Sequence, residues 1–154
     1  MSRAGLSTLM VYWDAMNIYF SCSITGGRHD QQNYQAIVNH LMQLGHQVPT
    51  AILADANVMA LENVVDPREV YLRDVNWVKN CDVLIAEVST PSHGVGYEIA
   101  LALSLGKPVF CCYQAGRKVS KMILGNNHPT LQIGEYQNLE QALRAVDCFL
   151  DGLS

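Results

Sequence analysis

Residues 82–98, with the sequence DVLIAEVSTPSHGVGYE, constrain the fold of this chain more than any other segment. They open with a short apolar run, Val83–Ala86, which is typical of a strand buried in a parallel sheet. A loop of small and polar residues follows, and then an apolar helix from about Gly96 to Leu105. Such an arrangement can bind an anion, because the unpaired backbone N–H groups of the first helical turn point toward the loop.

The same alternation of strand and helix runs through the rest of the chain. The sequence predicts strands near 17–20, 51–54, 83–86, 109–113 and 130–133, and helices near 30–44, 67–78, 96–105 and 139–149. Short connections between such elements imply parallel strands and right-handed crossovers. We therefore expect an N-terminal extension over residues 1–15. Residues 16–154 should form a single-domain, flavodoxin-like (Rossmann-like) three-layer α/β sandwich with a five-stranded parallel sheet in the order 2-1-3-4-5.

Composition excludes several classes of partner. The chain has 154 residues and a net charge of −4, and it contains no basic run, so we expect neither a nucleic acid polymer nor a membrane surface as partner. Its five cysteines include no CxxC pair, which favours buried thiols in a reducing, cytoplasmic location. The apolar stretch at 9–13 is too short for a signal peptide. The five histidines are scattered, so we expect neither a metal site nor a cofactor.

In a sheet of this order, ligands bind at the carboxyl ends of the strands, between the first and third strands. The loops at 21–28 and 88–96 meet there and bring hydroxyl, glycine and carboxylate groups together. Carboxylates suit a sugar, and hydroxyls with backbone N–H groups suit a phosphate, so we predict a sugar-phosphate site. No Walker motif, GxGxxG or Ser-His-Asp set is visible, which argues against an ATPase, a dehydrogenase or a hydrolase triad. The candidate residues are Tyr19, Ser23, Gly26, Gly27, Arg28, Asp74, Asp82, Ser92, Gly94 and Glu98.

Simpler interpretations of these residues remain open. Glu98 near a helix start can complement the helix dipole, which would lower its pKa and keep it ionised. Asp74 shares the inward stripe of its helix, so it either pairs with Arg68 or Arg73 or has a raised pKa. Ser120 can cap a short helix.

Taken together, these motifs resemble a known family, the 2′-deoxynucleoside 5′-phosphate N-hydrolases of the nucleoside 2-deoxyribosyltransferase superfamily. The resemblance covers residues 17–150, and the GVGYE segment combined with the N-terminal GGR is its most specific part. It is carried by Ile18-Tyr19-Phe20, Ser23-Ile24, Gly26-Gly27-Arg28, Asp74, Trp77, Asp82-Val83, Ala86-Glu87-Val88, Pro91-Ser92, Gly94-Val95-Gly96-Tyr97-Glu98, Gly116-Arg117, Ser120 and Met122-Ile123.

The resemblance implies roles for individual residues. Glu98 matches the carboxylate that attacks the anomeric carbon, Asp74 the acid that assists departure of the base, and Tyr19 a sugar-site residue that helps to hold the nucleophile. It implies a homodimer with shared active sites, in which Ser120 reaches the neighbouring subunit. The substrate-binding residues that it implies are Ser23, Ile24, Thr25, Gly26, Arg28, Asp82, Ser92, Gly94 and Ser120.

Three functions follow as alternatives. The first is hydrolysis of the N-glycosidic bond of a (deoxy)nucleoside 5′-monophosphate to the free base and (deoxy)ribose 5-phosphate. The second is a nucleoside 2-deoxyribosyltransferase, which acts on a nucleoside and passes the sugar to another base; Thr25, where the hydrolases carry Arg, favours this alternative. The third is a non-enzymatic nucleotide-binding module.

Overall fold

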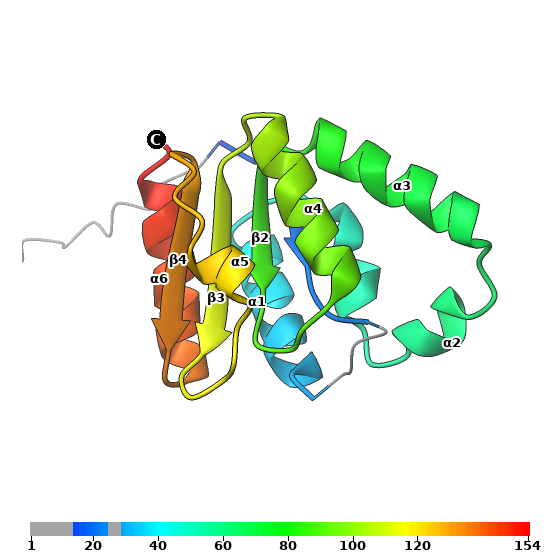
Figure 1. Ribbon diagram of the computed structural model, residues 1–154, viewed down its shortest axis with the longest axis horizontal. Helices are drawn as coiled ribbons and strands as arrows, with labels where there is room; N and C mark the ends of the chain where they lie inside the picture. Colours follow the sequence, from blue (N-terminus) through cyan, green and yellow to red (C-terminus); the bar gives the residue numbers. More distant parts are fainter. Residues whose placement is uncertain (1–13, 25–28) are drawn as a thin grey trace, which may run out of the picture.

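A parallel β-sheet with helices on both faces forms the centre of the molecule (Figure 1). The computed structural model describes residues 14–24 and 29–154. Within them the sheet has four strands in the order β1-β2-β3-β4, and every adjacent pair is parallel. The strands are β1 (Ile18–Ser21), β2 (Val83–Glu87), β3 (Val109–Gln114) and β4 (Leu131–Tyr136).

The helices divide between the two faces of the sheet. They are α1 (Gln31–Gln43), the 3-10 helix η1 (Pro49–Ala54), α2 (Val58–Glu62), α3 (Pro67–Asn80), α4 (His93–Ser104), α5 (Lys121–Leu124) and α6 (Leu139–Asp151). Helices α1 and α6 pack on one face and α3 and α4 on the other (Figure 1). The prediction of an α/β fold with a parallel sheet is therefore confirmed.

Strand residues alternate between the two cores, as the period of an extended chain requires. In β1, Ile18 and Phe20 pack under α1 and α6, whereas Tyr19 packs under α4. Both sets are almost fully buried, so the sheet is covered on both sides. This alternation fixes which strand residues face α4.

The prediction of a strand at 51–54, and with it a five-stranded sheet, is wrong for the described residues. These residues belong to η1, which has Pro49 in its first turn. The Thr50 hydroxyl accepts a hydrogen bond from Phe20 N at 2.9 Å. This backbone N–H at the edge of β1 therefore has a partner without a fifth strand. Within residues 14–24 and 29–154, only an isolated parallel bridge between Asn17 and Gln47 extends the sheet on that side.

Side-chain caps define the starts of several helices. Asp66 and Asn138 cap α3 and α6 through their side chains. Helix α4 begins at His93 rather than near Gly96, because Ser92 is its N-cap. Asp30 occupies the N-cap position of α1 without a side-chain capping bond, since its carboxylate pairs with Arg117 instead.

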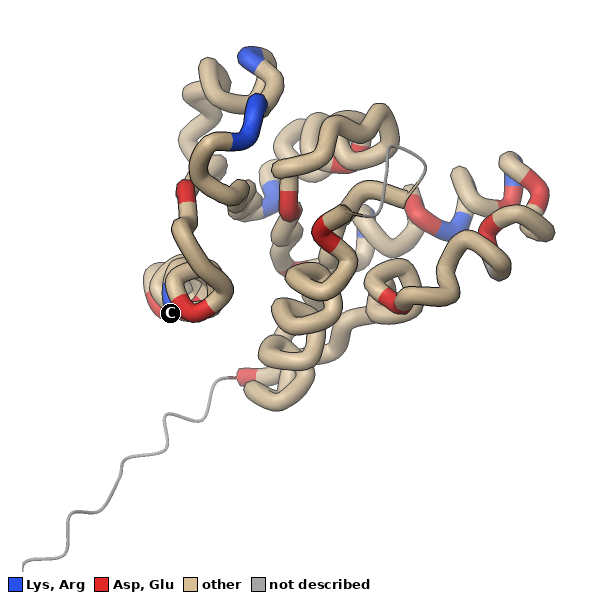
Figure 2. The backbone as a smooth tube through the Cα atoms, turned by 90° about the horizontal axis from the view of Figure 1, so that it is seen from below, with Lys and Arg blue, Asp and Glu red and all other residues tan. Residues whose placement is uncertain are grey.

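Two further findings bear on partners. None of the helices in residues 14–24 and 29–154 is long and apolar enough to cross a membrane. Lys and Arg are distributed over several separate elements (Figure 2).

Candidate active site

A cleft opens at the carboxyl ends of the strands, between α2, α3 and the start of α4. Its volume is about 370 Å³, and it is lined by Ile24 from the segment after β1, Glu62 from α2, Asp74 from α3, and Gly94 and Glu98 from α4. A second hollow of about 220 Å³ lies beside it and shares Asp74, Gly94 and Glu98. The two candidate catalytic carboxylates therefore line the same space.

Glu98 lies in the second turn of α4 and turns inward toward β1. Its Oε2 accepts a hydrogen bond from the Ser21 hydroxyl at 2.5 Å. Burial raises the pKa of Glu98 to about 7, although Ser21 and Tyr19 lower it. The expectation that the helix N-terminus would lower this pKa is wrong, because Glu98 lies beyond the first turn and desolvation dominates.

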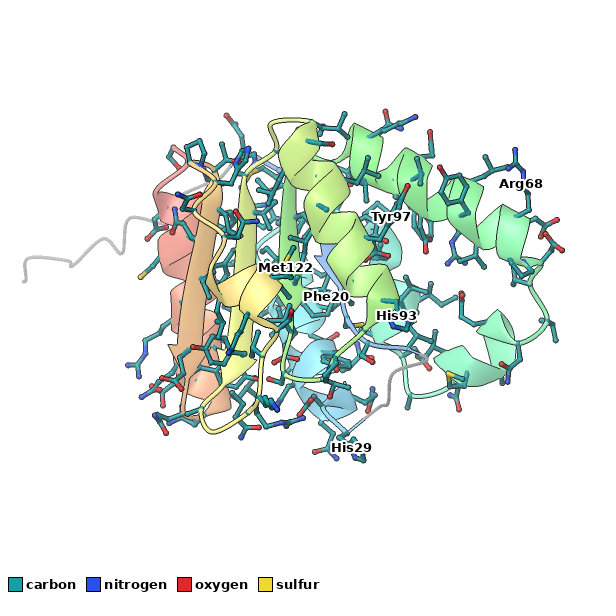
Figure 3. The ribbon with its side chains drawn as sticks, in the orientation of Figure 1. Phe20, His29, Arg68, His93, Tyr97 and Met122 are labelled. Carbon is teal, nitrogen blue, oxygen red and sulfur yellow. The ribbon has the colours of Figure 1, made fainter. Side chains whose placement is uncertain are left out.

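Asp74 is held by its neighbour on α3. Arg73 donates from Nε to Asp74 Oδ1 at 2.8 Å and from Nη1 to Glu62 Oε1 at 3.0 Å. The same guanidinium lies over the Trp77 ring, 4.9 Å from its centroid. Burial raises the pKa of Asp74, Arg73 lowers it and Glu62 raises it, so the net direction is upward. The expected upward shift is therefore confirmed, and Arg73 is the ion-pair partner; Arg68 lies toward the outer end of α3 (Figure 3).

Tyr19 lies beneath the carboxylates on the same face of the sheet. It is 1% exposed, and its hydroxyl lacks a hydrogen bond of standard geometry among the described residues. Burial raises the pKa of Tyr19, and Glu98 and Asp74 raise it further. The phenol is thus kept protonated beside Glu98, where its O–H can donate a hydrogen bond to a carboxylate or a ligand.

The predicted serines occupy two different places. Ser92 caps α4, accepting from Val95 N at 3.4 Å, and it lines the cleft together with Gly94; Ser23 is fully buried at the end of β1. Ser120 caps α5 and lines a separate cavity of about 430 Å³, which contains Ser92 but neither Glu98 nor Asp74. The structure therefore does not bring Ser120 to the carboxylates of its own chain.

Other predicted residues either lie away from the cleft or fall outside the residues that the structure describes. Asp82 precedes β2, at the opposite end of the sheet, and its Oδ2 accepts from Asn17 N at 2.7 Å. Thr25, Gly26 and Arg28 lie outside the described residues. His93 is exposed at the start of α4 (Figure 3). Within residues 14–24 and 29–154, no group of three or more His, Cys, Asp or Glu could hold a metal ion.

Sequence reasoning missed two residues that shape the site, Ser21 and Glu62, and one of the two ion pairs of a third residue, Arg73. Strand alternation could have identified Ser21, because it lies two residues after Tyr19 and so faces the same side. Glu62 lies in a segment with no clear period, and its approach to α3 is a tertiary effect. Arg73 was considered only as a neutraliser of Asp74, whereas it connects Asp74 to α2.

The fold and the cleft define an α/β protein with paired acids at the carboxyl edge of a parallel sheet. Comparison with known proteins gives the family. A model of the nucleoside 2-deoxyribosyltransferase family matches residues 18–143, and the chain belongs to this family.

Relatives and solved structures agree with this assignment. The 5-hydroxymethyl-dUMP N-hydrolase of Rattus norvegicus is 43% identical over 113 residues, which cover 71% of this chain and 69% of that protein. The 5-hydroxymethyl-dUMP N-hydrolase of Danio rerio is 38% identical over 128 residues, covering 81% and 90%. The structure of Clostridium botulinum CMP N-glycosidase is similar in fold, with a TM-score of 0.66 at 19% identity over 86% of this chain and 98% of that chain.

Proposed function

We propose that this protein hydrolyses the N-glycosidic bond of deoxynucleoside 5′-monophosphates, releasing the free base and deoxyribose 5-phosphate. The observation that carries the proposal is the position of the partly buried Glu98 carboxylate. In a member of this family, it lies in one cleft with Asp74 and is held by Ser21. A carboxylate beneath an anomeric carbon stabilises the oxocarbenium-like transition state or bonds to it.

Two chemical steps follow from this arrangement. Glu98 Oε2 is occupied by Ser21, so Oε1 is the oxygen that attacks C1′. The C1′–N bond breaks, its electron pair goes to the base, and the base takes a proton from Asp74. A water molecule then attacks C1′, releases the Glu98 carboxylate and returns a proton to Asp74.

The electrostatics support these two roles. Asp74 has a raised pKa, which favours the protonated form that a general acid needs. Glu98 has a pKa of about 7, so a substantial fraction is ionised at neutral pH, and positive charge developing at C1′ stabilises the ionised form. Substrate binding in the cleft therefore favours the active protonation state.

Recognition of the 5′-phosphate is assigned to Ser23, Ser92, Gly94 and, from a second copy of the chain, Ser120. A Cβ at Gly94 would meet no protein atom closer than 3.9 Å, so packing within the chain does not require glycine there. Close approach of a ligand to the backbone does explain it. Ile24 lines the cleft and would contact the sugar or base.

A homodimer with shared sites is part of this proposal. Ser120 lines a cavity beside α4 rather than the catalytic cleft, so it would serve a neighbouring subunit. Met122 lines the same cavity as Ser120 and is 85% exposed (Figure 3). Tyr97 and Leu105 of α4 are also exposed apolar side chains. Contact with a second copy would bury these side chains. Sedimentation that shows only monomers at micromolar concentration contradicts the dimer.

Base exchange is the second candidate function, and Thr25 is the observation that favours it. The Thr25 hydroxyl, where the hydrolases carry an Arg guanidinium, lacks a strong ligand for phosphate. A site of this kind suits a nucleoside better than a monophosphate. We further propose a cytoplasmic location, because four of the five cysteines are buried within the fold as thiols.

One experiment separates the candidates. The protein is incubated with a panel of nucleosides and nucleoside 5′-monophosphates, including 5-hydroxymethyl-dUMP, with and without a second free base. Release of free base from a monophosphate without any exchanged product supports hydrolysis. Formation of an exchanged nucleoside supports transfer. Binding without any turnover contradicts both and leaves the nucleotide-binding module.

A further inference from the structure

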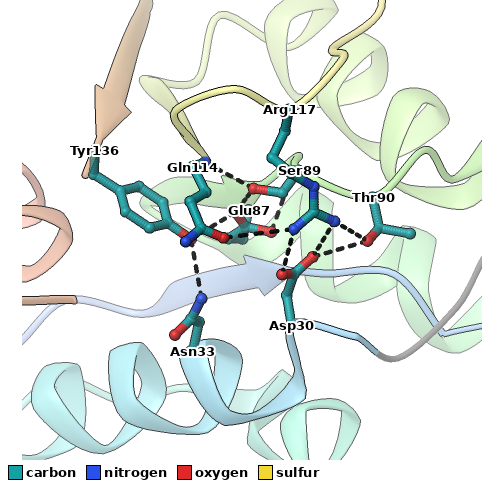
Figure 4. Close-up of polar contacts among 8 residues, drawn as sticks. All are labelled: Asp30, Asn33, Glu87, Ser89, Thr90, Gln114, Arg117 and Tyr136. Atoms are coloured by element: carbon teal, nitrogen blue, oxygen red, sulfur yellow. Dashed lines mark hydrogen bonds and ion pairs between the residues drawn. The ribbon is translucent and has the colours of Figure 1, made fainter. Parts of the chain in front are cut away.

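A polar network centred on Arg117 joins three segments at the carboxyl ends of the strands (Figure 4). Arg117 donates from Nη1 to Asp30 Oδ1 at 2.9 Å and from Nη2 to Asp30 Oδ2 at 3.0 Å. Its Nη2 also donates to Thr90 Oγ1 at 3.2 Å, and Thr90 Oγ1 donates to Asp30 Oδ2 at 2.8 Å. We call Arg117, Asp30 and Thr90 the clamp.

The clamp is well suited to fix positions. Two parallel N–H···O bonds between a guanidinium and a carboxylate set orientation as well as distance. Asp30 is 5% and Thr90 is 6% exposed, so loss of Arg117 would leave a buried carboxylate without its charge partner. Gly116 has a φ of +80°, which residues with side chains rarely adopt, and this turn directs Arg117 back toward α1.

A second, buried hydrogen-bond network lies beneath the clamp. Glu87, at the end of β2, is fully buried and accepts hydrogen bonds from the Ser89 hydroxyl and from Tyr136 Oη, the latter at 3.0 Å. Ser89 Oγ in turn accepts from Gln114 N at 2.8 Å. These contacts join the ends of β2, β3 and β4, so the clamp adjusts the loops above the sheet rather than the sheet itself.

Two of the clamped segments carry two of the three serines assigned to the phosphate. Thr90 lies two residues before Ser92, and Arg117 lies three residues before Ser120. Ser92, Ser120 and Thr90 line the same cavity of about 430 Å³. None of the three clamp residues lines the cleft that contains Glu98 and Asp74.

We propose that Arg117 is a positioning residue for 5′-phosphate recognition: through Asp30 and Thr90 it sets the placement of Ser92 and Ser120. This inference rests on the proposed function and adds to it the device that makes the site selective for monophosphates over nucleosides. The rival is that Arg117 binds the phosphate itself and replaces the guanidinium lost at Thr25. The geometry opposes the rival, because Asp30 and Thr90 already engage both terminal nitrogens.

Asp30→Asn distinguishes positioning from direct contact, because it weakens the clamp while leaving the guanidinium in place. We would compare Asp30→Asn, Arg117→Gln and the double variant, using a deoxynucleoside 5′-monophosphate and the matching nucleoside. Arg144→Ala is the matched control, since it breaks an exposed Arg–Glu pair on α6. Each single variant should raise KM for the monophosphate about tenfold, with nucleoside kcat/KM changed less than about twofold. The double variant should lose less than the product of the two single losses.

Several results would overturn the inference. If Asp30→Asn leaves monophosphate KM unchanged or lowers it while Arg117→Gln raises it, Arg117 contacts the phosphate directly. Equal losses for monophosphate and nucleoside mean that the clamp only maintains the fold. If Arg117→Gln fails to fold, the same comparison of the two substrates is made with the double variant, which buries no unpaired charge. If the wild-type protein turns over neither substrate, the proposed function fails; calorimetric binding of the same two compounds to the same variants then decides the inference separately.

Discussion

The hydroxyl of Ser21 donates a hydrogen bond of 2.5 Å to Glu98 Oε2 and joins residues that are 77 positions apart in the chain. Ser21 ends β1 and Glu98 lies in the second turn of α4. The bond therefore connects the sheet to the carboxylate that we assign as nucleophile. It fixes one oxygen and favours the ionised form of a group whose burial disfavours ionisation.

Ser21→Ala should move the acid limb of the activity profile to higher pH. The Ser21 hydrogen bond lowers the pKa of Glu98, so its loss lets burial raise that pKa further. A shift of about one unit corresponds to about a tenfold loss of kcat/KM at pH values below the limb. The measurement is kcat/KM against pH for a deoxynucleoside monophosphate. Ser104→Ala, which removes an exposed hydroxyl on α4, is the control. A limb in the wild-type position would show that Ser21 does not affect Glu98.

Glu98→Gln should abolish turnover and yet stabilise the protein above neutral pH. The pKa of Glu98 rises from 4.5 to about 7 on folding, so the native state binds more protons than the unfolded state between these values. Wild-type stability should fall as pH rises through this window, by up to about 3 kcal/mol. Gln has no such titration, so the variant should have the higher Tm at pH 8 and a similar Tm near pH 4. Equal Tm differences at both pH values would contradict the assignment.

Asp74→Asn should depress turnover of natural bases much more than turnover of a substrate whose leaving group needs no proton. Asp74 has a raised pKa through burial and is assigned as the proton donor. General acid catalysis typically contributes a factor of about 10²–10⁴, which sets the size of the expected loss. Equal losses for both substrates would assign Asp74 a structural role.

Glu62→Gln tests the network behind Asp74. Glu62 accepts from Arg73 and raises the pKa of Asp74, so its neutralisation should lower that pKa. The protonated fraction of Asp74 should then fall, and with it kcat/KM for a natural base, whereas a substrate whose leaving group needs no proton should be less affected. Glu69→Gln neutralises a carboxylate elsewhere on the exposed first turn of α3 and is the matched control. Equal losses for both substrates would indicate a general change in the cleft rather than an effect on Asp74.

Much of the fold was predictable because local signals and tertiary structure agree. The apolar run Val83–Ala86 and the helix start at residue 67 are local features, and both appear as expected. The segment 51–54 is the exception: its residues suit a strand, but Thr50 already satisfies the edge of β1 from a 3-10 turn. A hydrogen bond between a side chain and a distant backbone leaves no periodic pattern in the sequence.

The positions of the two candidate acids were easier to predict than their pKa values. Resemblance and helix phase placed Glu98 and Asp74, which line one cleft. The direction of the Glu98 pKa shift was wrong because the helix begins at His93, three residues earlier than expected, which leaves Glu98 beyond the reach of the helix terminus. Asp82 was expected near the sugar, yet it precedes β2 and so lies at the other end of the sheet. Its position follows from strand direction, which the sequence pattern already contained.

Mixing two impaired variants should restore activity if Ser120 acts in a neighbouring subunit. Ser120 lines a cavity apart from the cleft of its own chain, so each complete site would combine Glu98 of one copy with Ser120 of the other. In a heterodimer of Glu98→Ala and Ser120→Ala subunits, one site carries both defects and the other carries neither. Subunits mixed in equal amounts and allowed to exchange should form heterodimers as about half of all dimers. Monophosphate turnover at low substrate should therefore recover to about a quarter of the wild-type rate per subunit, well above either variant alone.

If Ser120 instead served its own chain, every site in the mixture would carry one defect, and the mixture would show only the average of the two parents. Mixing Glu98→Ala with Asp74→Asn is the control, because both residues line the cleft of one chain and no exchange can assemble an intact site from them.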